Sequence, residues 1–580
     1  MTTNDHGPSS NWPIEPYGGA LLDLVTDQER ASELRRASAR WPSWDLTDRQ
    51  LCDLELLANG GFSPLDGFMG EKDHASVCET MRLADGTLWP IPITLDVHPE
   101  LAGRLDTGSM LALRDPEGAL LAALEVREVF RPDRAWEAEA VYGTASAEHP
   151  GVAEVLGLGD RWCVAGRLEV VVPPAHHDFQ ALRRSPAELR REFAELGWDR
   201  VVAFQTRNPI HRAHHELTLR AGLAAGAKLL VHPVVGRTRQ GDVDHYTRVR
   251  GYQAVMPRYP AGTARLALLP LAMRMAGPRE AVWHAIIRRN HGCSHLVVGR
   301  DHAGPGADAR GRPFYDPYAA QELVGELEHE LGIGMVPFQA TAYVPDLDAY
   351  LPEDEVPGGT RVLAVSGTEV RRRLAAGEDL PGWFTFPEVA AELRRSYPAR
   401  RDQGVVVFLC GLSGAGKSAI ANALAARLQE LGGRAVTLLD GDLVRRLLSS
   451  ELGFSKEHRD LNVRRIAFVA AAVARSGGAA ICAQIAPYDA ARRQARAMVE
   501  PCGGFVLVHV ATPLEVCEAR DHKGLYAKAR AGVIGGFTGI SDPFERPTDA
   551  EVVVDTSGLT VGDAVDVVID HLREAGYLST

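Results

Sequence analysis

Residues 411–418 read GLSGAGKS and match the pattern G-x-x-x-x-G-K-[ST], whose glycines let backbone N–H groups curl around phosphate oxygens. The lysine of the pattern adds a positive charge, and the hydroxyl of Ser418 can hold Mg²⁺. A chance glycine-rich turn is the alternative interpretation. We therefore predict a nucleotide-phosphate cradle made of Gly411, Leu412, Ser413, Gly414, Ala415, Gly416, Lys417 and Ser418.

A buried strand and a helix must hold this loop. Residues 405–410, VVVFLC, form a continuous apolar run that suits a strand buried on both faces of a parallel sheet, and residues 419–433 have helical spacing and end in Gly-Gly. A second apolar run, 435–442, ends in Asp440 and Asp442 at the carboxyl edge of the predicted sheet, where open α/β folds bind ligands. One carboxylate could act as a base or contact magnesium. The alternative, strongest for Asp442, is a cap of the next helix.

Two later segments are rich in Arg, Lys, Gly and aromatic residues within loop-like sequence. They are residues 453–465, GFSKEHRDLNVRR, and residues 520–545, RDHKGLYAKARAGVIGGFTGISDPFE. This composition is typical of a mobile lid over an anionic nucleotide.

From about residue 404 onward the chain resembles adenylylsulfate kinase, through these segments together with GLSGAGKS, DGDLVR and IAPYDAARRQAR. The resemblance implies transfer of the ATP γ-phosphoryl group to the 3′-hydroxyl of adenosine 5′-phosphosulfate. It assigns ATP and magnesium to Lys417 and Ser418 and makes Asp440 the candidate base. The other predicted nucleotide contacts are Arg445, Phe454, Arg459, Asn462, Lys523 and Phe537, with the two phenylalanines stacking on adenine.

One position departs from the family pattern. Many members have serine where this chain has Ala486, and that serine is associated with a phosphorylated form. Alanine has no hydroxyl, so the resemblance implies that this form is absent here. Direct in-line transfer needs positioning and charge neutralisation but no protein nucleophile, so it is unaffected in principle.

A second candidate site lies upstream. Residues 201–222, VVAFQTRNPIHRAHHELTLRAG, predict a strand at 201–204, a polar turn, and a helix that begins near His211. His211 and His214 are three residues apart, so they share one face of the first helical turn, near its partial positive end. With Arg207 in the turn, they predict a site for triphosphate oxygens.

Two other interpretations of these histidines stay open. H-x-x-H spacing supplies two zinc ligands, but His215 lies on another face, and no H-E-x-x-H motif or nearby cysteine pair completes a tetrahedral site. The other interpretation is a purely structural pair. Local spacing favours the structural pair over zinc.

The segments that follow favour an anion site. Residues 229–253 and 273–306 each join an apolar strand to a loop of Gly, Arg and His, and alternating helices and strands imply a parallel α/β sheet. Such loops at the carboxyl edge suit a nucleotide. The second loop consists of Gly299, Arg300, Asp301, His302, Ala303 and Gly304.

From about residue 15 to residue 395 the chain resembles ATP sulfurylase, through LCDLELLANGGFSPLDGFM, QTRNPIHRAHHEL, GRDHAGPG, FYDPY and VSGTEVRRRL. The implied reaction converts ATP and sulfate to adenosine 5′-phosphosulfate and pyrophosphate. The resemblance assigns sulfate to Gln205 and Arg207, the active centre to Thr206, Arg207 and Asn208, the ATP phosphates to His211 and His214, and the nucleotide to Gly299, Arg300, Asp301, His302 and Ala303.

These residue types suit that chemistry. Sulfate is a weak, fully ionised nucleophile, so the reaction requires no general base. It requires fixed donors that hold two mutually repelling anions in line at the α-phosphorus. The Arg207 guanidinium offers fork-like recognition of an oxyanion, whose geometry lysine cannot reproduce.

The whole chain is predicted to be a multidomain α/β protein. Runs at 89–97, 109–115 and 119–130 predict a compact β domain, which by the resemblance is PUA-like. The predicted domains are residues 1–172, PUA-like; 173–330, a nucleotidyltransferase-type adenylyl-transfer domain; 331–398, a small subdomain; and 404–580, a P-loop kinase domain.

Bulk composition excludes several classes of protein. The net charge of −13 argues against general nucleic-acid binding, and no apolar run is long enough to span a bilayer, so we expect a cytoplasmic protein without a membrane partner. The eight cysteines are scattered singly, which predicts reduced, mostly buried thiols. The resemblance also implies self-association.

The leading hypothesis is a bifunctional enzyme that uses ATP and Mg²⁺ to make 3′-phosphoadenosine 5′-phosphosulfate from sulfate. The alternative is an ATP sulfurylase whose kinase-like part is inactive and binds the final product as a regulator. An inactive relic would not need Lys417, Ser418 and Asp440 together, so the sequence favours activity.

Overall fold

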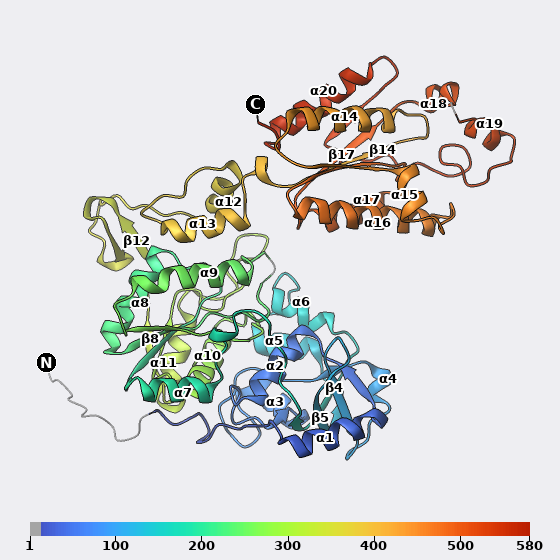
Figure 1. Ribbon diagram of the computed structural model, residues 1–580. Coiled ribbons are helices and arrows are strands. Elements are labelled where there is room, and N and C mark those ends of the chain that lie inside the picture. The colour runs from blue at the N-terminus through green and yellow to red at the C-terminus, as the bar shows by residue number, and fades with distance from the viewer. Residues whose placement is uncertain (1–12, 240, 522, 580) are drawn as a thin grey trace. The chain divides into compact units, whose positions relative to one another are not determined.

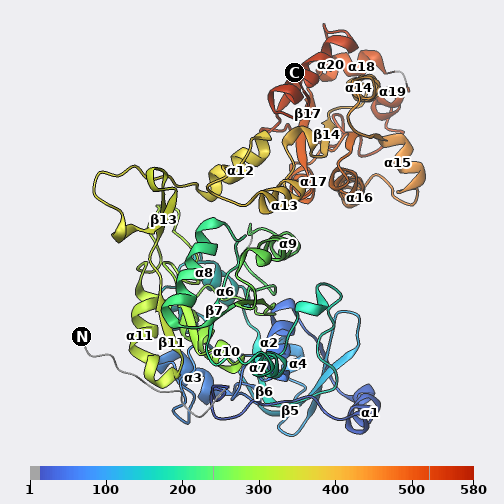
Figure 2. The same ribbon diagram turned by 60° about the vertical axis from the view of Figure 1, so that its left-hand side comes forward.

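The computed structural model describes residues 13–239, 241–521 and 523–579. The chain divides into two compact units (Figures 1 and 2). Unit 1 contains Met1–Val365 and Pro381–Glu392, and unit 2 contains Ser366–Leu380 and Leu393–Thr580. Within the described residues, no helix combines the length and apolar character needed to cross a membrane.

Unit 1 begins with a mainly antiparallel sheet of order β1-β4-β5-β6-β2, in which β3 also pairs with β6. Its strands are β1 (Ser43–Asp45), β2 (Gly67–Phe68), β3 (Asp96–Val97), β4 (Met110–Arg114), β5 (Leu120–Phe130) and β6 (Trp162–Val170). Its helices are α1 (Gln28–Ala37), α2 (Asp48–Ala58), α3 (Glu71–Thr80), α4 (Pro99–Ala102), α5 (Arg134–Tyr142) and α6 (Pro150–Gly157).

The strand predictions at 109–115 and 119–130 are confirmed by β4 and β5. The prediction at 89–97 is wrong for most of its length, because only Asp96–Val97 pairs as a strand. Pro90 and Pro92 have no N–H to donate to a ladder, so this apolar run is buried as irregular chain.

The second sheet of unit 1 is entirely parallel, with the order β11-β10-β7-β8-β9. Its strands are β7 (Val201–Phe204), β8 (Lys228–Val231), β9 (Ala264–Leu266), β10 (His295–Val298) and β11 (Gly334–Pro337). The helices in this part are α7 (Pro186–Glu195), α8 (Arg212–Ala225), α9 (His245–Val255), α10 (Pro278–Asn290) and α11 (Ala319–Leu331). A hairpin, β12 (Thr341–Val344) with β13 (Ala349–Pro352), follows. The parallel sheet confirms the predicted α/β architecture.

One buried cluster runs through both sheets of unit 1. At its centre the Phe62 ring lies 5.9 Å from the Trp89 ring and 5.1 Å from the Trp283 ring, measured between centroids. Trp283 belongs to α10, which is buried on nearly every face, as expected of a helix enclosed in a core. The core therefore holds α10 firmly beside strand β10.

Unit 2 contains a second parallel sheet, of order β15-β16-β14-β17-β18. Its strands are β14 (Val405–Cys410), β15 (Val436–Asp440), β16 (Ala479–Ala483), β17 (Gly504–Val510) and β18 (Val552–Val554). Its helices are α12 (Gly367–Ala376), α14 (Lys417–Leu431), α15 (Gly441–Leu447), α16 (Lys456–Arg475), α17 (Asp489–Val499), α18 (Leu514–Arg520), α19 (Leu525–Arg530) and α20 (Val561–Glu574), while α13 (Pro387–Ser396) spans the division between the units.

Helices cover both faces of this sheet (Figure 1). α14 and α20 pack together over one face, and α16 and α17 pack together over the other, each pair enclosing its own apolar cluster. Strand β14 is fully buried at the centre, as its apolar run predicts. The phosphate-binding loop thus connects a buried strand to the helix that follows it.

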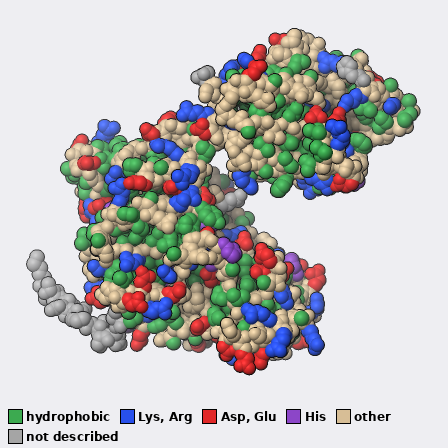
Figure 3. Space-filling view, viewed as in Figure 1, with side chains coloured by type: hydrophobic (Ala, Val, Ile, Leu, Met, Phe, Trp, Pro, Cys, Tyr) green, Lys and Arg blue, Asp and Glu red, His purple; other side chains and the backbone are tan. Residues whose placement is uncertain are grey.

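Cysteine burial and the distribution of surface charge bear on the predictions made from composition. Six of the eight cysteines are buried and the other two are half-buried, which confirms the predicted burial. On the face shown in Figure 3, acidic and basic side chains are interspersed over both units.

Gly404, immediately before β14, provides a test of how closely this strand is packed. A Cβ atom added there would lie 2.0 Å from the Ala474 carbonyl oxygen, so we expect Gly404→Ala to destabilise unit 2 by about 1–3 kcal/mol. All nine tryptophans lie in unit 1, so their fluorescence reports unit 1 alone, whereas far-UV circular dichroism reports both units. In urea, the dichroism transition should shift while the fluorescence transition stays in place.

Gly558→Ala is the matched control, because a Cβ atom there would meet no atom of the described chain within 4 Å. A Gly404→Ala protein with an unchanged dichroism transition would contradict the predicted close packing.

Candidate functional site

Most of the predicted residues of unit 1 line a cavity of about 410 Å³ at the carboxyl edge of the parallel sheet, whereas His211 and Gly304 lie outside its lining. The turn after β7, the loop after β10 and the chain after β11 form its walls. Its lining includes Gln205, Thr206, Arg207, Asn208, His214, Met273, Gly299, Arg300, Asp301, His302, Ala303, Phe338 and Gln339. Sequence analysis did not identify Met273, Phe338 or Gln339.

Arg207 is held by an acidic partner that sequence analysis missed. Its Nη1 lies 2.6 and 2.8 Å from the two carboxylate oxygens of Asp242, and its Nη2 donates to the Gly304 carbonyl at 3.4 Å. Next to it, the Gln205 Oε1 atom is buried without a hydrogen-bond partner. An incoming oxyanion would therefore find a donor fork already oriented, with one carboxylate to displace or share.

Thr206 and Asn208 shape the turn that carries Arg207. The Thr206 hydroxyl accepts from the Asn208 N–H at 3.1 Å and lies 3.2 Å from the Asn208 carbonyl. The Tyr252 hydroxyl donates to that same carbonyl at 2.6 Å. Thr206 is nearly buried, so its hydroxyl organises the turn.

His211 and His214 occupy different surroundings. His211 is the N-cap of α8, and its N–H donates to the His214 Nδ1 at 3.2 Å, which leaves the proton of neutral His214 on Nε2. His214 lines the cavity, whereas the His211 Nδ1 lies 2.9 Å from the Thr385 hydroxyl and its ring packs 4.3 Å from Phe384.

Burial lowers the pKa of His214 to about 4, and burial together with His214 lowers the pKa of His211 to about 3. Both rings are therefore neutral near pH 7. They can donate N–H groups to phosphate oxygens, and the positive charge of the site comes from arginine and from the helix N-terminus.

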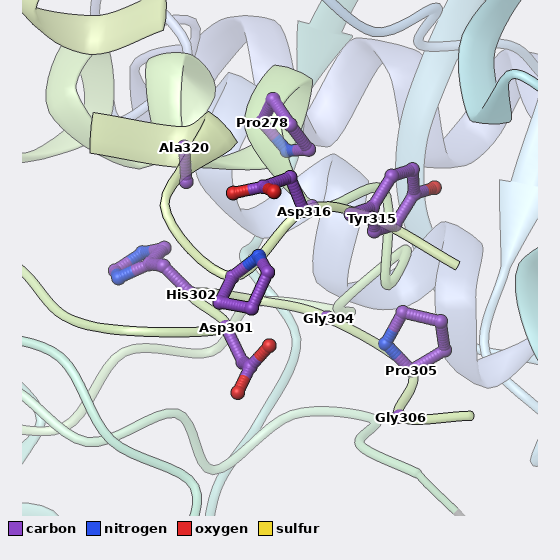
Figure 4. Close-up of a pocket in the computed structure, with 11 residues that line it drawn as sticks. Pro278, Asp301, His302, Gly304, Pro305, Gly306, Tyr315, Asp316 and Ala320 are labelled. Atoms are coloured by element: carbon purple, nitrogen blue, oxygen red, sulfur yellow. The ribbon is translucent and has the colours of Figure 1, made fainter. Parts of the chain in front are cut away.

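The predicted nucleotide loop after β10 has an unusual backbone. Asp301 and Ala303 both have φ of 53°, a left-handed conformation that non-glycine residues rarely adopt. The Asp301 N–H donates to the Pro317 carbonyl at 2.8 Å, and the Gly277 N–H donates to the Ala303 carbonyl at 3.3 Å. Figure 4 shows Asp301 and His302 projecting in different directions from this loop.

In unit 2 the cradle has the conformation that its glycines predict. Gly414 and Gly416 have φ of 74° and 100°, and α14 begins at Lys417. The Lys417 ammonium donates to the Leu412 carbonyl at 2.6 Å, across the loop, where a phosphate would lie. Burial lowers the pKa of Lys417 to about 8.

The two carboxylates after β15 have separate partners. Asp440 Oδ2 accepts from the Ser418 hydroxyl at 2.9 Å, and Asp440 Oδ1 accepts from the Asp442 N–H at 3.0 Å. Asp440 is therefore the cap of α15, and the alternative that gave this role to Asp442 is wrong. Asp442 instead pairs with Lys523 at 2.5 Å.

Ser418 and Asp440 together present hard oxygen donors beside the cradle, which is the donor set that Mg²⁺ prefers when substrate phosphates complete its shell. In the part of the chain that the structure describes, no group of three or more His, Cys, Asp or Glu side chains is arranged to hold a metal ion. His215 packs on Tyr259, 4.6 Å between ring centroids, so its face of α8 points into apolar surroundings.

A cavity of about 880 Å³ extends from the cradle to the lid segments. Its walls bring together the remaining predicted residues of unit 2, which are Arg445, Phe454, Arg459, Asn462, Lys523 and Phe537. Phe454 is 68% exposed, and the Arg445 guanidinium lies 4.3 Å from the centre of its ring. Such an exposed aromatic face is available for stacking.

Arg459 ties the lid to helix α16. Its Nη1 donates to the Thr538 hydroxyl at 2.5 Å and to Asp542 at 2.9 Å, and its Nε donates to the Phe454 carbonyl at 2.8 Å. Asn462 Oδ1, in the next turn of α16, is buried without a partner.

Sequence analysis missed Gln484, which lines the same cavity directly after β16. Both polar atoms of its side-chain amide are buried without a hydrogen-bond partner, so they are free to bind a ligand group. A polar residue that ends a wholly apolar strand, AAICAQ, was the available signal. Nearby, Ala486 has φ of 43° and accepts from Arg492 at 2.7 Å through its carbonyl.

Three family models cover most of the chain. A PUA-like domain matches residues 14–173, ATP-sulfurylase matches residues 180–396, and adenylylsulphate kinase matches residues 403–555. The chain is thus similar to both families that its motifs resemble, in the predicted order.

Relatives extend over nearly the full length. The sulfate adenylyltransferase of Emericella nidulans is 55% identical over 97% of this chain and 99% of that protein, and that of Mycosarcoma maydis is 53% identical over 96% and 98%. A solved structure, the hexameric APS kinase from Thiobacillus denitrificans, covers 97% of this chain and 99% of its own, at 41% identity and a TM-score of 0.80.

The lowered pKa of Lys417 predicts how nucleotide binding to unit 2 depends on pH. A phosphate binds the charged ammonium better, and the unliganded amine loses its proton above about pH 8. Affinity for a nucleoside triphosphate should be constant below that pH and fall up to about tenfold per pH unit above it. Calorimetric titration of Lys417→Ala, which isolates binding to unit 1, identifies the signal that belongs to unit 2.

Lys417→Arg is the matched comparison, because a guanidinium stays charged throughout this range. If Lys417→Arg and the unaltered chain lose affinity equally above pH 8, another group is responsible.

Proposed function

Because the chain belongs to the sulfate adenylyltransferase family and also carries an adenylylsulfate kinase domain, we propose that it activates sulfate in two successive reactions. Unit 1 joins sulfate to the adenylyl group of ATP and releases pyrophosphate. Unit 2 then phosphorylates the 3′-hydroxyl of the adenosine 5′-phosphosulfate. The observation that carries this proposal is the presence of two separate cavities, one lined by Arg207 and Arg300 and the other by Lys417, Arg445 and Arg459.

In unit 1, we propose that Gln205 and Arg207 bind the sulfate that attacks the α-phosphorus. The oriented Arg207 guanidinium supports this role, and Gln205 could donate to sulfate through Nε2, which lies 3.9 Å from the Met273 sulfur. His214 and Asn208 would steady the triphosphate, while His211 supports α8 from behind through Thr385. The pocket contributes positioning and charge stabilisation, and no protein group forms a covalent bond with substrate.

In unit 2, we propose that Lys417 and the cradle N–H groups hold the ATP phosphates, and that Asp440 accepts the proton of the attacking 3′-hydroxyl. Ser418 and Asp440 would hold Mg²⁺, which neutralises charge on the β- and γ-phosphates when bound. The unpartnered amides of Asn462 and Gln484 support a role in binding the sulfonucleotide.

Coupling explains why both reactions belong in one chain. The first reaction makes a phosphoric-sulfuric anhydride and is unfavourable, so a kinase that consumes its product draws it forward. The four-part domain division and the cytoplasmic location remain proposals. We also propose self-association, supported by the hexameric state of the similar structure from Thiobacillus denitrificans.

The direct test is incubation of the chain with ATP, Mg²⁺ and radiolabelled sulfate, followed by separation of the nucleotides. We expect label first in adenosine 5′-phosphosulfate and then in its 3′-phosphorylated form. Label that stops at the first product would support the alternative, an inactive regulatory kinase domain. No nucleotide-linked label would refute the proposed function.

The two activities should be separable by mutation of the cradle. Lys417→Ala removes the cation that faces the phosphates, so phosphorylation of supplied adenosine 5′-phosphosulfate should fall at least about a hundredfold. Pyrophosphate release from ATP and sulfate should persist, because unit 1 has its own ATP site. Loss of both activities would show that they are not independent.

Arg207→Ala should have the opposite effect. Sulfate-dependent pyrophosphate release should fall about a hundredfold, since the oxyanion loses its charged fork, while kinase activity on supplied adenosine 5′-phosphosulfate stays intact. Arg207→Lys keeps the charge without the fork and should recover only part of the rate. Unchanged pyrophosphate release in Arg207→Ala would remove this residue from the centre.

A further inference from the structure

Helix α10 carries three ionisable side chains on one buried face of unit 1. Glu280, His284 and Arg288 follow one another at intervals of four residues, and none of them has any exposed surface. Burying such groups costs folding free energy unless partners compensate them. Because these three groups lie buried beside the predicted nucleotide loop, we expect them to have a role there that apolar side chains could not fill.

The carboxylate of Glu280 is fixed by the backbone before the helix. Its Oε1 accepts from the Arg274 N–H at 3.0 Å, and its Oε2 accepts from the Ala276 N–H at 2.9 Å. Burial raises the pKa of Glu280, but donors on both oxygens favour the ionised form. The same Oε1 lies 3.4 Å from the His284 Nε2, which makes no hydrogen bond of its own, and the nearby negative charge favours a proton on that nitrogen.

The opposite nitrogen of His284 contacts the nucleotide loop, because its Nδ1 lies 3.0 Å from the His302 Nε2. Burial lowers the pKa of both rings, that of His302 to about 3, so both are neutral. Only one hydrogen fits between two neutral rings, and His284 holds its own on Nε2. His302 therefore donates through Nε2, and its Nδ1 is left as an acceptor.

His302 lies in the predicted nucleotide loop, between two cavities. It lines both the 410 Å³ cavity and the small neighbouring cavity drawn in Figure 4. The residues on either side, Asp301 and Ala303, are the two with left-handed backbone. Strained backbone of this kind persists only where its surroundings hold it in place.

We propose that His284 is a positioning residue for the nucleotide loop of unit 1, acting through its hydrogen bond to His302 with Glu280 behind it. The inference rests on the proposed sulfate adenylyltransferase activity, to which this loop supplies the predicted nucleotide contacts. It assigns a role in ATP binding to the buried polar face of α10. Glu280 determines which of the two rings, His284 or His302, donates the hydrogen bond between them.

The test compares His284→Leu with His284→Asn. Asparagine can place an oxygen near the position of Nδ1 and accept from His302, whereas leucine fills volume without an acceptor. We expect the KM for ATP in adenosine 5′-phosphosulfate synthesis to rise about tenfold in His284→Leu, with kcat changed less than about threefold. His284→Asn should restore the KM to within about threefold of the unaltered chain.

His74→Leu is the matched control, because His74 is also buried, with its Nε2 3.3 Å from a carboxylate oxygen of Glu137, but it lies outside the cavity. That variant should lower the urea midpoint of tryptophan fluorescence without changing the KM for ATP. A folded His284→Leu protein with unchanged KM, or equal KM rises in His284→Leu and His284→Asn, would overturn the proposal.

A spectroscopic measurement covers the case in which His284→Leu fails to fold. In ¹⁵N-histidine-labelled chain, with His302→Asn used for assignment, His302 should appear as the neutral Nε2–H form from about pH 5.5 to 8. A proton on Nδ1, or titration within that range, would overturn the proposal. If the unaltered chain makes no adenosine 5′-phosphosulfate, the proposed function fails instead, and that result is separate from these outcomes.

Discussion

The convergence of donors at the carboxyl edge of a parallel sheet is the constraint on which both cavities depend. Bound anions repel one another, so the groups that hold them must be fixed before the anions arrive. In unit 1 the turn after β7 and the loop after β10 bring donor groups to one cavity, and in unit 2 the cradle after β14 brings them to the other. The buried strands and the helices packed on them keep these loops in register.

Several cationic groups that line the two cavities are paired with nearby carboxylates. Arg207 pairs with Asp242, Lys523 with Asp442, and Arg459 with Asp542, while burial lowers the pKa of His211 and His214 and keeps both rings neutral. Positive groups in a cavity repel one another as strongly as bound anions do. Local carboxylates therefore offset this repulsion, and an anion that binds there must compete with them or share their cationic partners.

Much of this organisation could be predicted from the sequence. Continuous apolar runs identified β7, β10 and β14, and the residue types in the turns after them predicted which loops line the two cavities. The irregular chain at 89–97 was not predicted, because two prolines outweigh its apolar character. The alternative that placed the helix cap on Asp442 was wrong, because Asp440 makes the cap and neighbouring carboxylates have the same local signature.

Contacts between residues far apart in the chain left no local signal. Thr385 reaches His211 across 174 residues, and Asp242 reaches Arg207 across 35. The tautomer of His302 depends on Glu280 through a third side chain. Contacts of this kind can be recognised only in the folded chain. The candidate site residues themselves could be selected from composition and spacing, and they remain predictions.

The pairing of Arg207 with Asp242 has a consequence for selectivity. The Arg207 guanidinium already has a counter-ion, the Asp242 carboxylate. The binding free energy of a solute that displaces this carboxylate is therefore only the difference between the two interactions with the guanidinium. A halide is a single sphere, so it cannot place separate acceptor atoms on Nη1 and Nη2, as the Asp242 carboxylate and the Gly304 carbonyl do together. A tetrahedral dianion can, so the exchange itself filters the abundant monovalent salts of the surroundings from the pocket.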